Sequence, residues 1–153
     1  MKQIKKPIFS SELEQLSIEL NSDRHYVPLQ GSIQAGFPSP AEDFLLDRIS
    51  LDERYLSKIE STFINRVKGL SMYTDYLEND ILIIRSDYEA QNHDDIVVSV
   101  NASDYTLKRY DKHNQKLIAL NTDYSNSIQL SEGDEVIILG VVDTLIREKK
   151  KHR

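Results

Sequence analysis

Six short apolar or alternating segments, separated by polar turn clusters, occupy the chain from residue 61 to residue 142. The clusters are rich in Asn, Asp and Ser, which favour turns. Several short strands spaced in this way predict a mainly β domain of partly rolled antiparallel sheets. The expected strands are STFINRV at 61–67, ILII at 81–84, IVVSV at 96–100, YTLKRY at 105–110, KLIAL at 116–120 and VIILGVV at 136–142.

The chain before residue 61 has a different character. Ser11 and Glu14 have the spacing of a capping box, and Leu13, Leu16 and Leu20 recur at helical intervals, so a short helix is predicted from Ser11 to about residue 21. Residues 26–40 contain three prolines and two glycines, which predict an extended or looping arm. AEDFLLD at 41–47 fits a short helical turn. The predicted division is an N-terminal arm, 1–40, and a β-rich domain, 41–153.

Composition excludes several classes of function. The chain has 153 residues, which suits one domain. Its net charge of -6 argues against binding of nucleic acid through the overall charge of the protein. It has no cysteine, so a thiolate nucleophile, a disulfide framework and a Cys-ligated metal are excluded. No apolar run has a membrane-spanning length, and the N-terminus lacks the apolar region of a secretory signal, so a cytoplasmic protein with no membrane contact is expected.

The conventional catalytic and cofactor motifs are missing from the sequence. The four histidines lie in polar stretches without metal-ligand spacing, and no G-x-S-x-G nucleophile motif occurs. A Ser-His-Asp triad is left open by composition alone. His93 with Asp94 and Asp95 could bind a metal but is more typical of a turn. Gly-rich phosphate-binding motifs are absent, and no cofactor is expected.

Ser71 and Lys108 form the one unconventional pair that the pattern suggests. Gly69 permits a sharp turn after the 61–68 strand, which would present Ser71, and a serine needs a base to become a nucleophile. Alternation in YTLKRY places Lys108 and Arg109 on opposite faces, so one of the two cations faces inward. Burial disfavours an ammonium, and lowering its pKa to near 7 costs about 4–5 kcal/mol, which a fold would keep only for chemistry. Because strand lysines usually face water, spacing alone leaves this pair as one hypothesis among several.

Four segments together resemble the UmuD branch of the LexA-like family of self-cleaving serine–lysine peptidases. AGFPSPAED at 35–43 resembles its cleavage region, with the scissile bond between Ala35 and Gly36. GLSM at 69–72 resembles the nucleophile motif, and YTLKRY resembles the strand that carries the catalytic lysine. LNTDYS at 120–125, followed by VIILGVV, resembles the closing segment. The spacings agree as well: 35 positions from Gly36 to Ser71 and 37 from Ser71 to Lys108.

The chain departs from the family pattern at three positions. Leu70 stands where the UmuD branch commonly has an acidic residue, as an apolar residue does in the repressor members. Asn79 stands where a glycine usually precedes an aspartate, and Asp94 stands where Gly-Asp is common. Asn and Asp tolerate positive φ better than most residues, so both turns are expected to form.

The resemblance implies an activity and a set of partners. It implies a LexA-like catalytic domain with Ser71 and Lys108 as a catalytic dyad that cuts Ala35–Gly36. It further implies a homodimer active in the SOS response, self-cleavage stimulated by a RecA nucleoprotein filament, and a shortened form that joins a UmuC-like Y-family polymerase in translesion synthesis. The 35 residues before the cut are too few for the helix-turn-helix of the repressors, so direct sequence-specific DNA binding is not expected.

Three alternatives stay open at this stage. The chain could be a non-catalytic dimeric module that binds a polymerase, a fragment of a LexA-like repressor, or a peptidase that acts on other proteins. The first two predict the same fold, and only the intact Ser71, Lys108 and Ala35-Gly36 favour self-cleavage over them.

Overall fold

The computed structural model describes residues 6–19, 27–30, 45–124 and 126–149. The chain forms two compact units. The larger unit contains the described residues up to Ile18 and those from Ser61 onward, and the smaller unit contains those between Glu19 and Glu60. The predicted boundary between residues 40 and 41 stays a prediction.

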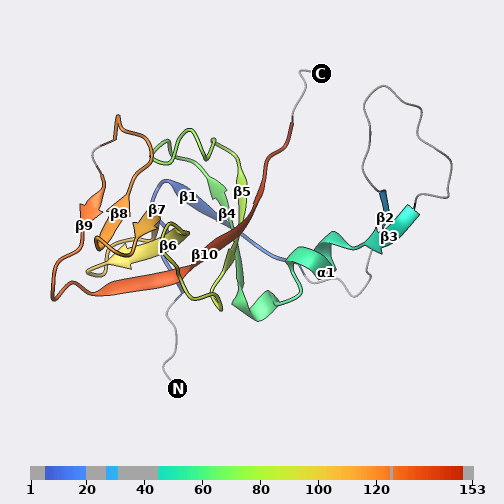
Figure 1. The fold of residues 1–153 in the computed structure, drawn as a ribbon, viewed down its shortest axis with the longest axis horizontal. Coiled ribbons are helices and arrows are strands. Elements are labelled where there is room, and N and C mark those ends of the chain that lie inside the picture. The colour runs from blue at the N-terminus through green and yellow to red at the C-terminus, as the bar shows by residue number, and fades with distance from the viewer. Residues whose placement is uncertain (1–5, 20–26, 31–44, 125, 150–153) are drawn as a thin grey trace. The chain divides into compact units, whose positions relative to one another are not determined.

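The larger unit is a curled antiparallel sheet of eight strands, which confirms the predicted fold class (Figure 1). Its strand order is β1-β4-β5-β10-β6-β7-β8-β9. Every strand predicted after residue 61 is present, with ends shifted by a few residues. The strands are β1 Leu13–Leu16, β4 Thr62–Val67, β5 Ile81–Arg85, β6 Asp95–Val100, β7 Thr106–Asp111, β8 Lys116–Ile118, β9 Ile128–Gln129 and β10 Val136–Ile146.

The long strand β10 joins the two halves of this sheet. Its first half pairs with β6 and its second half pairs with β5, and Figure 1 shows it running through the sheet of the larger unit between these two strands. The register shifts between Ile138 and Gly140 and again between Val142 and Thr144. Such irregularities bend a strand and increase its twist, which lets one strand serve both halves of a rolled sheet.

Apolar side chains pack on both faces of the sheet. On β6, Val97 belongs to one buried cluster, whereas Ile96 and Val98 belong to the other, as strand alternation requires. The buried members of the first cluster are Leu13, Val67, Met72, Tyr76, Leu82, Ile84, Val97 and Leu107. Those of the second are Ala90, Ile96, Val98, Leu117 and Val141.

The predicted N-terminal helix is wrong. Residues 13–16 form the edge strand β1, which pairs antiparallel with β4 from Leu13 opposite Val67 to Leu16 opposite Ile64. Leu13 is buried in the first cluster, and Glu14 forms an ion pair with Lys68 instead of a capping box. The free edge of β4 offers backbone partners along its length, and this tertiary pairing overrides a weak local helix signal.

The smaller unit is built from β2 Val27–Gln30, β3 Leu45–Ile49 and the short helix α1 Leu51–Tyr55, followed by the 3-10 turn Ile59–Ser61. β2 and β3 pair antiparallel, which fits the extended arm predicted for residues 26–40 as far as residue 30. The helical turn predicted at 41–47 is wrong for residues 45–47, which lie in β3. The helix comes later, where Ser50 caps it by accepting a hydrogen bond from the Glu53 N–H.

Two turns carry the departures from the family pattern. Asn79 has a φ of 74°, so the residue that replaces glycine there does adopt the left-handed conformation, as expected. In the other turn the left-handed residue is His93, with a φ of 69°, rather than Asp94. Asp94 instead accepts a hydrogen bond from the Gln91 N–H and closes the turn.

In the part of the chain that the structure describes, no helix has the length and apolarity to cross a bilayer.

Candidate active site

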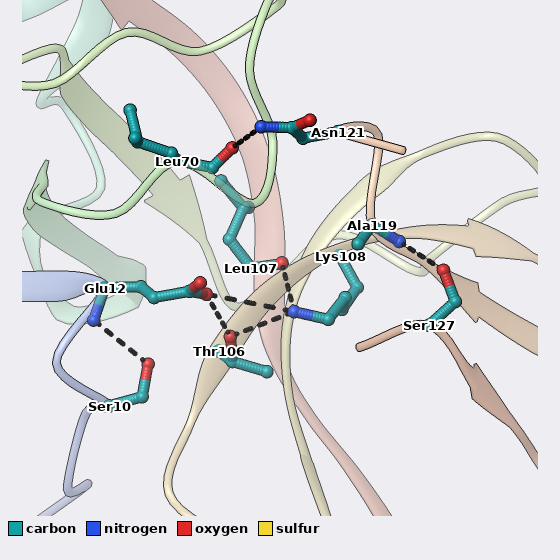
Figure 2. Close-up of polar contacts among 9 residues, drawn as sticks. All are labelled: Ser10, Glu12, Leu70, Thr106, Leu107, Lys108, Ala119, Asn121 and Ser127. Carbon is teal, nitrogen blue, oxygen red and sulfur yellow. Dashed lines mark hydrogen bonds and ion pairs between the residues drawn. The ribbon is translucent and has the colours of Figure 1, made fainter. Parts of the chain in front are cut away.

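Ser71 lies in the turn that follows β4 and is almost fully buried, with 2% of its surface exposed. The chain after β8 holds this turn in place. The Asn121 N–H donates to the Ser71 carbonyl at 2.8 Å. The Asn121 side-chain amide donates to the Leu70 carbonyl at 2.9 Å, a contact that Figure 2 shows. Met72 packs into the first core cluster directly after the serine. The Ser71 main chain is therefore fixed from both sides.

Lys108 is the largest fully buried side chain among the described residues, with 2% exposed. It lies on β7 opposite the buried Ile96 of β6, and paired residues of adjacent strands share a face of the sheet. Its Nζ donates to the Leu107 carbonyl at 3.2 Å and to the Thr106 hydroxyl at 3.3 Å (Figure 2). The amine is thus enclosed, and both of these hydrogen-bond acceptors belong to its own strand.

This environment changes the acidity of the amine. Burial lowers the pKa of Lys108, because the charged form loses its hydration, and the nearby Glu12 carboxylate opposes part of that effect by raising it. The net pKa of Lys108 lies below its ordinary value. A lysine with a lowered pKa is uncharged at a lower pH than usual and can then accept a proton.

The neighbouring cation has the opposite environment. Arg109 points to the other face of β7 and forms a two-pronged contact with Asp95, at 2.8 and 3.0 Å, and a further one with Asp75 at 3.1 Å. The hydrogen bonds that Arg109 donates to Asp95 raise the pKa of Arg109 above its usual range. Of the two adjacent cations that the sequence singled out, only Lys108 is suited to act as a base.

Sheet register relates the two proposed catalytic residues. β7 pairs with β8 so that Arg109 lies opposite Ile118. The chain that continues from β8 is steadied by the Ala119 N–H donating to Ser127 at 2.9 Å, and it reaches Asn121, which binds the Ser71 carbonyl. The Ser71 main chain is therefore linked to the segment that follows β8, and β8 is the strand next to the one that carries Lys108.

The proposed cleavage site, Ala35 and Gly36, lies outside the described residues. In the sequence it falls between β2 and β3. Its relation to Ser71 and Lys108 stays a prediction.

Sequence reasoning missed one acidic residue at this site. Glu12 lies directly before β1, and its carboxylate is 3.8 Å from the Lys108 Nζ and 3.0 Å from the Thr106 hydroxyl, which donates to it. Figure 2 shows this side chain reaching Lys108 from the N-terminal segment. The helix predicted over this segment gave no reason to expect the contact of Glu12 with Lys108, and no local pattern links residue 12 to β7. The glycine of GLSM was the one available signal, because Gly69 packs against the Glu12 side chain.

The residues considered for metal binding do not form a metal site. Asp94 closes its own turn, and Asp95 is occupied by Arg109 and by the Tyr76 hydroxyl, which donates at 2.5 Å. Within the described ranges, no group of three or more His, Asp or Glu side chains is arranged to hold a metal ion.

Comparisons with known proteins agree on one family. The model of the Peptidase S24-like family matches residues 28–143. A LexA repressor of Thermotoga petrophila is 31% identical over 128 residues, which cover 83% of this chain and 64% of the repressor. A LexA repressor of Thermotoga neapolitana is 32% identical over the same shares. Protein ImpA of Salmonella typhimurium is 36% identical over 76 residues, 50% of this chain and 52% of ImpA. The chain thus spans less than two-thirds of each of these relatives.

Proposed function

Since this chain belongs to the Peptidase S24-like family, we propose that it is a serine peptidase that cuts its own Ala35–Gly36 bond, with Ser71 as nucleophile and Lys108 as general base. The observation that carries the proposal is the burial of Lys108 together with the lowered pKa of its amine. Taking a charged amine out of water costs free energy even where it has hydrogen bonds and an ion pair, and proton-transfer chemistry accounts for a buried amine at this position.

The reaction begins with proton transfer. Neutral Lys108 accepts the proton of the Ser71 hydroxyl, and the Ser71 Oγ attacks the Ala35 carbonyl carbon. The tetrahedral oxyanion accepts hydrogen bonds from the backbone N–H of Ser71 and one neighbouring N–H. The Lys108 ammonium then donates its proton to the Gly36 nitrogen as the C–N bond breaks.

A second round completes hydrolysis. The first round leaves Ala35 as an acyl ester on Ser71 and frees the new amino terminus at Gly36. A water molecule gives a proton to Lys108 and attacks the ester carbon, which releases the Ala35 carboxylate and restores the Ser71 hydroxyl. Gly36 suits the bond that is cut, because a residue without a Cβ lets the backbone approach a nucleophile closely.

The substrate arm belongs to the same chain or to a second copy in a homodimer. A tethered arm has a high effective concentration, so weak docking suffices and control rests on how often the arm is engaged. A RecA nucleoprotein filament that favours the engaged state would stimulate cleavage without adding catalytic groups. The shortened chain then serves as an accessory subunit of a UmuC-like error-prone Y-family polymerase in the SOS response, as the resemblance implies.

Mass spectrometry after incubation at about pH 10 tests the proposal, because high pH deprotonates the lysine without an activator. We expect a new fragment that begins at Gly36. Neither Ser71→Ala nor Lys108→Met should produce it, whereas the matched variants Ser86→Ala and Lys116→Ala, at exposed positions, should cleave like the wild type. A Gly36 fragment from the Lys108→Met chain would exclude Lys108 as the base.

The similarity to LexA repressors favours one alternative, that this chain is the corresponding part of a repressor. A repressor role requires specific DNA binding, which the net charge of -6 does not favour. Titration of the intact chain with a library of DNA duplexes at physiological salt separates the two roles. Enrichment of one sequence would support the repressor, and salt-sensitive or absent binding without enrichment would support the polymerase accessory.

A further inference from the structure

The N-terminal segment brings an acidic group onto the proposed catalytic lysine. The Glu12 carboxylate lies 3.8 Å from the Lys108 Nζ, and the Thr106 hydroxyl bridges the two by donating to Glu12 at 3.0 Å and accepting from Lys108 at 3.3 Å. The Glu12 side chain is 21% exposed and that of Lys108 2% exposed. This ion pair is therefore largely shielded from water, and Figure 2 shows Glu12 and Lys108 converging with Thr106 between them.

The main chain around Glu12 is anchored on both sides of the site. The Ile8 carbonyl accepts from the Tyr105 N–H, and the Ser10 N–H donates to the Tyr105 carbonyl, both at 2.8 Å. The Glu12 carbonyl accepts from the Lys68 N–H at 2.8 Å and from the Gly69 N–H at 3.3 Å. The segment thus runs from the start of β7 to the end of β4, and this path places residue 12 beside Lys108.

Side-chain packing restricts the carboxylate further. Gly69 leaves room for the Glu12 side chain, since a Cβ at that position would lie 2.6 Å from the Glu12 Cγ. The first atoms of the side chain are therefore held against the turn that carries Ser71. Their direction leads the carboxylate to Thr106 and Lys108 rather than to solvent.

No other charge that the structure describes competes for this role. On the strands that flank β7, the residues in register with Lys108 are Ile96 on β6 and, one position past β8, Ala119, and both are apolar. Asp75 and Asp95, the nearby acids of the neighbouring elements, bind Arg109 on the opposite face of β7. Glu12 is the charged group that acts on Lys108.

We propose that Glu12 is a positioning residue that holds Lys108 in place as the charged ammonium and thereby slows self-cleavage of the intact chain. The inference rests on the proposed function, in which only the neutral amine can take the Ser71 proton. Because residue 12 precedes the proposed cut at Ala35–Gly36, Glu12 and Lys108 belong to one covalent chain only until cleavage occurs. An interaction that draws the N-terminal segment away from β4 would separate Glu12 from Lys108 and raise the rate of self-cleavage.

The test compares Glu12→Gln with Glu14→Gln. Both substitutions remove one negative charge from the same segment, but Glu14 pairs with the exposed Lys68 and is not near Lys108. Lysine side chains labelled with ¹³C are titrated by NMR in a Ser71→Ala background, which keeps the chain intact, and Lys108→Met identifies the signal. Self-cleavage is followed in parallel from about pH 6 to about pH 11, a range that includes the ordinary lysine pKa and the region below it.

We expect Glu12→Gln to lower the midpoint of the Lys108 titration by about one pH unit, which raises the neutral fraction near pH 7 about tenfold. The cleavage rate near pH 7 should rise by the same factor of about ten, and the rates should converge at high pH, where Lys108 is neutral in both proteins. A purely structural role would change the rate at every pH. Glu14→Gln should match the wild type.

Several outcomes would overturn the inference. An unchanged titration midpoint of Lys108 in Glu12→Gln contradicts the proposal that Glu12 slows self-cleavage. A lowered midpoint with no faster cleavage near neutral pH contradicts it as well. If the chain cleaves at no pH, the proposed function fails, and the NMR titration still decides whether Glu12 sets the charge of Lys108. Should Glu12→Gln lose its native fold, Glu12→Asp keeps the charge but retracts it by one methylene, and a midpoint equal to that of the wild type would contradict the dependence on distance.

Discussion

Gly69 and Glu12 are packed so closely that no side chain fits at residue 69. A Cβ there would lie 2.6 Å from the Glu12 Cγ and 2.9 Å from the Glu12 Cβ. The sequence assigned Gly69 to a sharp turn, but among the described glycines only Gly133 has a positive φ. Gly69, the first residue of the GLSM motif, is therefore needed for the close approach of the N-terminal segment rather than for its own backbone conformation.

Gly69→Ala should destabilise the protein, because the Glu12 side chain meets the new methyl near its rigid base and must shift. We expect a loss of about 1–3 kcal/mol in the free energy of unfolding, the usual effect of overpacking. Urea unfolding measures it. Glu12→Ala in the same chain removes the obstructing Cγ and carboxyl carbon and leaves only the Cβ, at 2.9 Å. The two substitutions should therefore be non-additive, and additive effects would contradict the packing argument.

Lys108→Met should change the pH dependence of stability in the alkaline range. The folded pKa of Lys108 lies below the ordinary value of 10.5, so between these two values the unfolded chain binds more protons and stability due to Lys108 rises with pH. The free energy of unfolding of the wild type minus that of Lys108→Met should therefore increase from neutral pH to about pH 10. Urea unfolding at several pH values measures this difference. If the difference stays flat while Lys116→Met behaves like the wild type, the lowered pKa is wrong.

Asp80 and Arg147 tie the end of β10 to the turn after Ser71. The Asp80 carboxylate is buried and accepts from Arg147 at 2.7 and 2.8 Å and from the Leu77 N–H at 2.8 Å. Burial by itself raises the pKa of Asp80, but these hydrogen bonds outweigh it and the net pKa is lowered. At pH 7, Asp80→Asn should cost about 2 kcal/mol of stability, because charge-assisted hydrogen bonds are lost.

The lowered pKa of Asp80 also predicts that the protein loses stability in acid. Its pKa is depressed in the fold, so the stabilisation is complete above the unfolded value of about 3.9 and disappears as pH falls through the folded pKa. The gap between the wild type and Asp80→Asn should thus close below about pH 4. Thermal unfolding from pH 7 downward measures it. Asp104→Asn, at an exposed position, serves as the control and should follow the wild type throughout.

Asn65 lies in the middle of β4 and is fully buried, and neither polar atom of its side chain has a hydrogen-bond partner among the described residues. An unsatisfied buried amide costs about 1–3 kcal/mol. Asn65→Leu, which has the same number and branching of heavy atoms, should therefore raise the free energy of unfolding by about that amount, as measured by urea unfolding. Asn65→Ala removes the amide and the volume together and should gain less. A destabilised Asn65→Leu protein would show that the amide is satisfied in solution.

Much of the larger unit could be predicted because its signals are local. Alternating or apolar segments between polar turn clusters identify β4 to β8 and β10. A strand buried on one face has alternating apolar and polar residues, and a strand buried on both faces is a short apolar run. The helix α1 was missed although Ser50 and Glu53 have capping spacing, because that spacing is a weak signal without an apolar period. The prediction of an N-terminal helix was wrong for the opposite reason. The leucines there do recur at helical intervals, but pairing with the free edge of β4 was more favourable.

The pattern of residues along the chain suggested Ser71 and Lys108 as one hypothesis among several, because two adjacent cations on one strand must face opposite ways, and the resemblance to a known family then selected this pair. The pattern itself did not determine which cation is buried. That depends on Asp75 and Asp95, which reach Arg109 from other elements. The position of Glu12 beside Lys108 also depends on the fold, because the pairing of β1 with β4 and the hydrogen bonds of the N-terminal segment to Tyr105 bring that segment to β7. Periodicity describes neighbours along a chain, whereas the charge on a buried amine is set by groups that are distant in sequence and close in space.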